Sequence, residues 1–69
     1  MLLLGLDPGL RHTGWCVISS INDKASWIAS GNISPKVSLT LSERLKGIHQ
    51  GLDSIIQEYK PSVAAIEEV

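Results

Sequence analysis

The apolar positions in the first half of the chain predict three strands. Residues 1–7 are apolar up to Asp7, a pattern typical of a strand buried on both faces. Residues 13–21 and 25–33 are rich in β-branched and aromatic side chains, which favour strands. Asp7-Pro8-Gly9 and Asn22-Asp23-Lys24 separate the three as turns, the first with a glycine that accepts a positive φ. Since both connections are short, we expect an antiparallel meander.

The second half predicts one helix and a fourth strand. Apolar side chains recur at spacings of three and four residues, which gives one helical stripe: Leu41, Leu45, Ile48, Leu52, Ile55, Ile56 and Tyr59. Thr40 and Glu43 match a capping box at the helix start, and Pro61 stops the helix after Lys60 in its last turn. Residues 62–69 predict a strand that the helical crossover brings parallel to residues 1–7, the most apolar strand.

Two glycines lie inside the predicted helix. Gly47 and Gly51 each cost about 1 kcal/mol relative to alanine. Their spacing of four residues indicates either the close approach of a neighbouring element or plain tolerance in a long helix.

Composition narrows the class of protein. The chain has 69 residues and a formal net charge of −1, so it allows one small domain and gives no electrostatic case for binding nucleic acid. Its single cysteine, Cys16, fits a reducing compartment. The apolar opening meets Asp7 after six residues without a basic flank, which is too short for a signal peptide or a membrane span. We therefore expect a cytoplasmic protein that has no membrane partner.

Carboxylates at two strand ends are the first candidate for chemistry. If residues 1–7 and 62–69 are parallel neighbours about 4.8 Å apart, Asp7 lies beside Glu67 or Glu68. Two such carboxylates can share a divalent cation such as Mg²⁺. Successive strand residues point to opposite faces, so only one glutamate can face Asp7, and the pattern does not choose between them. The alternative is that Asp7 only accepts hydrogen bonds in its turn and the glutamates form a solvated strand end.

The opening residues also resemble a known family. Leu4-Gly5-Leu6-Asp7-Pro8-Gly9-Leu10-Arg11-His12-Thr13-Gly14-Trp15 is similar to the start of RuvC-type Holliday-junction resolvases. Three further matches follow in the family's order: Gly31-Asn32-Ile33, Leu41-Ser42-Glu43-Arg44-Leu45, and Tyr59-Lys60-Pro61 leading to Ala65-Ile66-Glu67-Glu68-Val69. The resemblance implies an α/β, ribonuclease-H-like fold, in which a βββαβ portion forms a mixed sheet. This agrees with the order that the apolar pattern predicts.

The resemblance implies a function as well. Members of the resolvase family are Mg²⁺-dependent endodeoxyribonucleases that act as homodimers and nick four-way DNA junctions symmetrically in recombination and repair. By matching position, Asp7 corresponds to the first catalytic and metal-binding carboxylate and Glu67 to the second, with Glu68 facing away. Two Mg²⁺ ions per complete site and a branch-migration helicase as partner are implied in the same way.

The chain departs from the family pattern in two respects. Cys16 stands where the family usually has glycine, and we assign it no catalytic role. The family's remaining acidic or histidine ligands lie later, so we expect residues 1–69 to be the N-terminal part of a single nuclease domain with an incomplete metal site. His49 does not match those ligands, and His12 is either a turn residue or a phosphate contact. Arg11, Lys36 and Lys46 are interpreted as solvated surface.

Other functions are compatible with the same residues. One alternative is a non-catalytic remnant, or a dimerisation or DNA-binding module, of the same ancestry. Another is a ribonuclease-H-like nuclease that processes ribosomal RNA.

Overall fold

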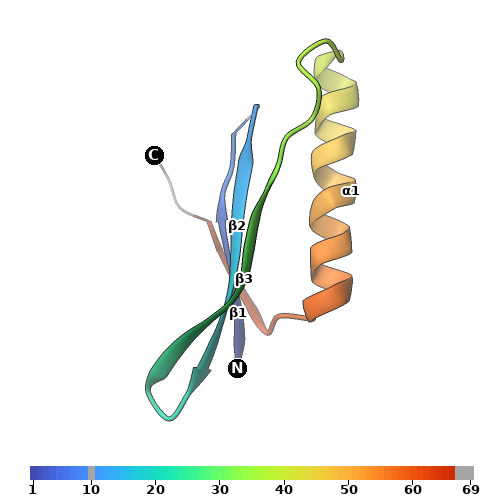
Figure 1. The fold of residues 1–69 in the computed structure, drawn as a ribbon. Helices are drawn as coiled ribbons and strands as arrows, with labels where there is room; N and C mark the ends of the chain where they lie inside the picture. The colour runs from blue at the N-terminus through green and yellow to red at the C-terminus, as the bar shows by residue number, and fades with distance from the viewer. Residues whose placement is uncertain (10, 67–69) are drawn as a thin grey trace.

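The computed structural model describes residues 1–9 and 11–66 of the chain. Its elements follow the predicted order: β1 (Leu2–Asp7), β2 (Thr13–Ile21), β3 (Lys24–Ile33), α1 (Leu41–Tyr59) and β4 (Val63–Ile66). The strands form one sheet in the order β3-β2-β1-β4, and α1 lies along one side of it (Figure 1). The predicted mixed βββαβ arrangement is therefore confirmed.

β1 occupies the interior of the sheet, as its apolar sequence predicts. It pairs antiparallel with β2, from Leu2 opposite Ser19 to Asp7 opposite Gly14, and parallel with β4 through residues 3–6. All four residues of β4 are exposed at the sheet edge. Lys24, predicted in the turn, is instead the first residue of β3, and the predicted strand residues 67–69 lie outside the described ones.

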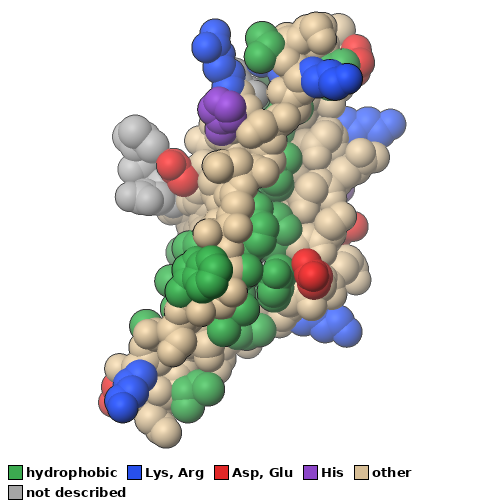
Figure 2. Space-filling model, in the orientation of Figure 1, with side chains coloured by type: hydrophobic (Ala, Val, Ile, Leu, Met, Phe, Trp, Pro, Cys, Tyr) green, Lys and Arg blue, Asp and Glu red, His purple; other side chains and the backbone are tan. Residues whose placement is uncertain are grey.

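The core lies between the sheet and α1. Leu4, Val17 and Ile55 are its buried apolar residues, with 1%, 0% and 7% of their surface exposed. Hydrophobic side chains line the seam between the strands and the helix (Figure 2). The expectation that β1 is buried on both faces is wrong: Leu4 is buried, whereas its neighbours Leu3 and Gly5 are only half-buried. In the part of the chain that the structure describes, α1 covers one face of the sheet only.

Local signals set the limits of α1. Thr40 accepts a hydrogen bond from the Glu43 amide at 3.2 Å and donates one to the Glu43 carboxylate at 2.9 Å, which confirms the predicted capping box. Lys60 is the C-cap, with φ 48°, and not a residue of the last turn. Its amide donates to the carbonyl of Ile56 at 2.8 Å. α1 lacks the length of apolar sequence that crossing a membrane requires.

The two helical glycines differ in their surroundings. A Cβ on Gly51 would lie 2.9 Å from Cδ1 of Ile33 on β3, so Gly51 allows the helix to approach the sheet closely. A Cβ on Gly47 would meet Pro35 at 3.9 Å, an ordinary contact. Close approach therefore explains Gly51, and tolerance explains Gly47.

Candidate active site

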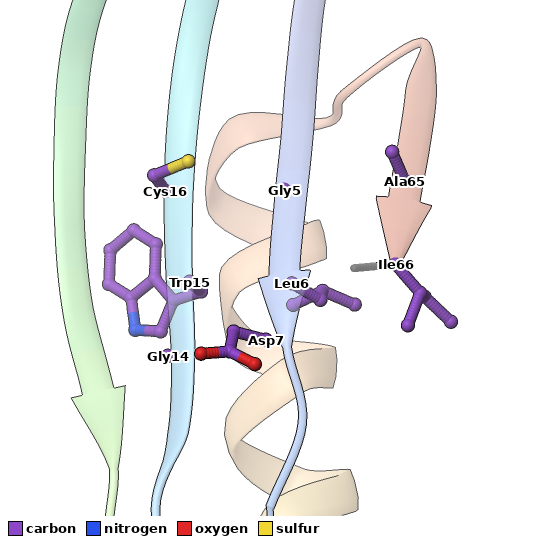
Figure 3. A pocket seen from close by; sticks show the side chains of 8 residues that line it. All are labelled: Gly5, Leu6, Asp7, Gly14, Trp15, Cys16, Ala65 and Ile66. Carbon is purple, nitrogen blue, oxygen red and sulfur yellow. The ribbon is translucent and has the colours of Figure 1, made fainter. Parts of the chain in front are cut away.

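A pocket of about 430 Å³ opens where β1, β2 and β4 lie side by side (Figure 3). Its lining residues come from these three strands and none from α1: Gly5, Leu6, Asp7, Gly14, Trp15, Cys16, Ala65 and Ile66. Along β1, Leu4 and Leu6 pack toward the core, so the alternating Gly5 and Asp7 face away from the helix. The pocket therefore belongs to the sheet face that α1 leaves uncovered.

Asp7 supplies the carboxylate of this pocket. It is the last residue of β1, it is exposed, and it pairs with Gly14 of β2. A Cβ on Gly14 would lie 3.8 Å from the Cβ of Asp7. Because Gly14 has no side chain, the space beside the carboxylate stays open, and Figure 3 shows the Asp7 carboxylate next to Gly14. The oxygens of Asp7 are thus accessible to a ligand from the pocket.

Gly5 and Cys16 form the next pair along β1 and β2. A Cβ on Gly5 would lie 3.0 Å from Sγ of Cys16, which is tighter than ordinary van der Waals contact. The half-buried thiol therefore occupies room that Gly5 leaves free. This pairing explains how a cysteine fits on β2 next to β1.

Hydrogen bonds within the β1–β2 connection hold the segment that follows Asp7. The Thr13 hydroxyl donates to the carbonyl of Gly9 at 3.1 Å, and its oxygen accepts from the Gly9 amide at 3.5 Å. Thr13 is 2% exposed, so this anchor is fixed in the packed part of the molecule. The expected positive φ at Gly9 is wrong, since no glycine among the described residues has one. Gly9 is required for space instead, because a Cβ there would lie 2.6 Å from the His12 carbonyl oxygen.

Asn32 is a polar residue near the site to which sequence reasoning gave no role. It pairs with Gly14 in the β2–β3 ladder, and its Oδ1 lies 3.6 Å from the place of a Cβ on Gly14. Asp7, Gly14 and Asn32 therefore form one row across three strands, with open space in the middle. The sequence signal for Asn32 is the pairing register, which cannot be read from one strand alone.

The two histidines lie in different segments, and only His12 makes a side-chain hydrogen bond that the structure describes. Nδ1 of His12 lies 2.9 Å from Oγ of Ser34, a contact that joins the β1–β2 connection to the segment after β3. His49 is an exposed residue of α1. Neither histidine is among the residues that line the pocket.

The donor set for a metal is incomplete among the described residues. Residues 1–9 and 11–66 contain no group of three or more His, Cys, Asp or Glu side chains that could hold an ion. Asp7 is where the sequence predicts it. Glu67, the second predicted ligand, lies outside the described residues, so its pairing with Asp7 stays a prediction.

Comparison with known proteins decides the family. The family model described as "Crossover junction endodeoxyribonuclease RuvC" matches residues 3–69. The chain belongs to the RuvC family. RuvC of Paramagnetospirillum magneticum is 44% identical over 68 residues, which cover 99% of this chain and 41% of the relative. RuvC of Bradyrhizobium diazoefficiens is 44% identical over 66 residues, which cover 96% and 38%. The chain thus spans about two-fifths of the length of these RuvC relatives.

Solved structures confirm the fold. Thermus thermophilus RuvC in complex with a Holliday junction substrate matches with a TM-score of 0.90 at 24% identity, covering 100% of this chain and 44% of that one. A Ppx/GppA protein from Aquifex aeolicus matches with a TM-score of 0.71 at 14% identity, covering 96% of this chain and 25% of that one. The same βββαβ portion therefore also occurs in a protein outside the RuvC family.

Proposed function

We propose that this chain forms the N-terminal part of a single ribonuclease-H-like nuclease domain that cuts four-way DNA junctions in recombination and repair. The observation that carries the proposal is the position of Asp7. It ends the interior strand β1, in a pocket on the uncovered face of the sheet. Membership of the RuvC family, whose model carries the name of a crossover junction endodeoxyribonuclease, supports this reaction over the ribosomal-RNA alternative.

Two carboxylates are proposed as the catalytic and metal-binding pair, Asp7 and Glu67. The last described pair of β1 and β4 is Leu6 and Ile66. In the sequence, Asp7 directly follows Leu6, and Glu67 directly follows Ile66. Because paired residues of parallel strands direct their side chains to the same face, this register supports Glu67 over Glu68 as the partner of Asp7.

The chemistry of the pocket fits Mg²⁺ through this pair. Mg²⁺ prefers oxygen ligands and is commonly held by one or two carboxylates together with phosphate oxygens of the substrate. Asp7 offers exposed carboxylate oxygens beside open space. When bound, two such ions would lower the pKa of an attacking water and stabilise the leaving oxygen. Further ligands are proposed to come from outside this chain segment.

Neighbouring residues, some of them outside the pocket lining, hold Asp7 in position. β1 is hydrogen-bonded on both sides, to β2 and to β4, so the backbone at its end is held firmly. The bond between Thr13 and the Gly9 carbonyl fixes the turn that leads away from the carboxylate. Gly14 leaves room for the phosphate of a DNA strand next to Asp7. These residues orient the carboxylate and the substrate without taking part in proton transfer.

The proposed reaction has consequences for partners and location. A four-way junction has two equivalent strands to cut, so a homodimer with two-fold symmetry places one site at each. A branch-migration helicase is proposed as the partner that supplies junctions. A nuclease of chromosomal junctions works where the chromosome is, which agrees with the expected cytoplasmic location.

The proposal is tested by removing the charge of Asp7. In the full-length protein, Asp7→Asn keeps the size of the side chain and removes a metal ligand. We expect single-turnover cleavage of a synthetic four-way junction in Mg²⁺ to fall by at least about 10²-fold, as for the loss of a group that acts at the reacting atoms. Glu67→Gln should give a loss of similar size.

Asp23→Asn is the matched control. It makes the same chemical change in the exposed turn between β2 and β3, where the φ of 62° is one that asparagine tolerates. We expect it to cleave at the wild-type rate. Cleavage that survives Asp7→Asn would remove Asp7 from the catalytic role. Junction binding with no cleavage by the wild-type protein would favour the binding-module alternative.

A further inference from the structure

A strip of polar side chains continues from Asp7 along the end of the uncovered sheet face. Gly14 pairs with Asn32, and Thr13 with Ile33. His12 and Ser34 follow one residue further, and their side chains meet at 2.9 Å. Ser34 comes two residues after Asn32, just beyond the end of β3 at Ile33, so this contact continues the end of the sheet next to Asn32. We call Asn32, Ser34 and His12 the polar strip.

We propose that the polar strip binds phosphates of the DNA strand that is cut at Asp7. This inference rests on the proposed function and adds residues that position its substrate. Asn32 lies across the open space over Gly14 from Asp7. Its Oδ1 is the amide atom nearest that space, and a half-turn of the amide about its last bond brings the NH₂ group there to donate to an oxygen of a phosphate between the two side chains.

The contact between His12 and Ser34 gives the ring a second donor. We assign the tautomer in which Nδ1 accepts from the Ser34 hydroxyl, which places the ring proton on Nε2. Nε2–H then projects away from Ser34 as a free donor. His12 is exposed, so this donor is open to a second phosphate further along the strand.

The charge near the polar strip favours an anion. Arg11 and Lys36 are exposed and lie within two residues of His12 and Ser34 in the sequence. Figure 2 shows Lys, Arg and His side chains gathered at the end of the molecule where the β1–β2 connection and the start of α1 lie. Although acidic side chains lie at this end too, Arg11 and Lys36 bring two positive charges close in sequence to the neutral donors of a chain whose net charge is −1. Phosphate backbones are attracted to such positive charges independently of base sequence.

Asn32→Asp separates the proposed role from the obvious alternative, a cation ligand. The variant has nearly the shape of asparagine but loses the donor and gains a negative charge. In the full-length protein with Asp7→Asn, which removes cleavage, we expect Asn32→Asp to weaken binding of a synthetic four-way junction in EDTA by about tenfold or more. Asn32→Ala should weaken it by less, since it removes the donor without adding repulsion.

Ser30→Ala is the matched control. Ser30 is an exposed residue of β3 one ladder step from Asn32 on the same face, opposite Cys16, and we expect no change in junction affinity. Equal binding by the Asp7→Asn protein with and without Asn32→Asp would overturn the proposal. So would an Asn32→Asp variant, with Asp7 intact, that binds junction normally and needs less Mg²⁺ for cleavage, because that result marks Asn32 as a cation ligand.

A double-mutant cycle tests the second donor. We expect His12→Ala to weaken junction binding about threefold, and Ser34→Ala to have no further effect once His12 is gone. Independent, additive losses would contradict a role for Ser34 in orienting the ring. These arms measure binding alone, so they are separate from the test of Asp7. If the polar-strip variants lose junction binding but the protein shows no Asp7-dependent cleavage, the proposed nuclease function fails and the polar strip stands. If cleavage depends on Asp7 but the polar-strip variants bind normally, the polar strip fails and the nuclease function stands.

Discussion

The two faces of the sheet are built from the same strands and have opposite characters. Under α1, the pair Leu4 and Val17 has almost no exposed surface. One step along the same strands, Gly5 and Cys16 line an open pocket. Since successive side chains of a strand alternate between faces, a residue of the core and a residue of the candidate active site are direct neighbours along the same strand.

The difference is one of side-chain size as much as polarity. The covered face carries leucines, valine and a tryptophan that packs at 6.1 Å, centroid to centroid, against Tyr59 of α1. The uncovered face at the site carries glycine at two of the pocket's eight lining positions, Gly5 and Gly14. Small residues there leave the volume that the proposed phosphodiester and its ions would require. Substitutions on the covered face should therefore act mainly on stability, and those on the uncovered face mainly on activity.

The largest expected effect of this contrast is in the core. Leu4→Ala removes a side chain that is 1% exposed and should lower the free energy of unfolding by about 2–5 kcal/mol. The neighbouring Leu3→Ala, on the uncovered face and half-buried, should cost about 1 kcal/mol. Urea unfolding of the two full-length variants measures both. Equal losses would show that Leu3 is as well covered as Leu4, and the contrast between the faces would fail.

Local sequence pattern was sufficient for the elements and for their order. The apolar run of β1, the helical stripe and the capping box at Thr40 each depend on neighbours close in the chain. The structure confirms the strand, the helix and its cap, whereas Leu41, Leu45 and Ile56 of the stripe are exposed. The parallel pairing of β1 with β4 followed from the length of the helical crossover. Lys60 was assigned to the last turn because the pattern gives no signal for its left-handed φ.

The candidate site was only partly accessible to such reasoning. Asp7 marks the end of an apolar strand, which the sequence displays directly. The row that joins it to Asn32 depends on the register of β2 and β3, which shifts at an irregularity between Val17 and Ile18. Register of this kind is set by pairing between strands and not by either strand's own pattern. The choice of Glu67 over Glu68 came from the family resemblance, because alternation alone leaves both open.

Two glycines on adjacent strands provide a smaller and sharper comparison. A Cβ on Gly31 would lie 3.0–3.1 Å from the Trp15 ring, so Gly31→Ala should destabilise the protein by about 1–3 kcal/mol through overpacking. A Cβ on Gly14 would meet Asp7 and Asn32 at 3.8 and 3.6 Å, which are ordinary contacts. Gly14→Ala should therefore change stability by less than about 0.5 kcal/mol.

Cleavage activity should be affected more by Gly14→Ala than by Gly31→Ala, which is the reverse of their expected effects on stability. The methyl group of Gly14→Ala narrows the space beside the carboxylate, and we expect junction cleavage to fall roughly tenfold through misplacement of the phosphate. Gly31→Ala should retain cleavage at temperatures where it is folded. Thermal unfolding and single-turnover cleavage of both variants test this ranking. A Gly14→Ala protein with full activity would mean that the space over Gly14 is not used by the substrate.

The smallest effect concerns how α1 is seated on the covered face. Gly47→Ala should stabilise the protein by about 1 kcal/mol, because alanine favours a helix and its Cβ would meet only Pro35, at 3.9 Å. Gly51→Ala carries the same gain in helix propensity, but its Cβ would lie 2.9 Å from Cδ1 of Ile33. The clash forces Ile33 or the helix to move, so the gain should be cancelled or reversed. Both substitutions change helix propensity by the same amount. The difference between the two free energies of unfolding, measured in urea, therefore reports the close contact between α1 and Ile33 of β3. If Gly51→Ala stabilised the protein as much as Gly47→Ala does, α1 would have room to shift on β3, and the covered face would be more loosely packed than the burial of Leu4 and Val17 indicates.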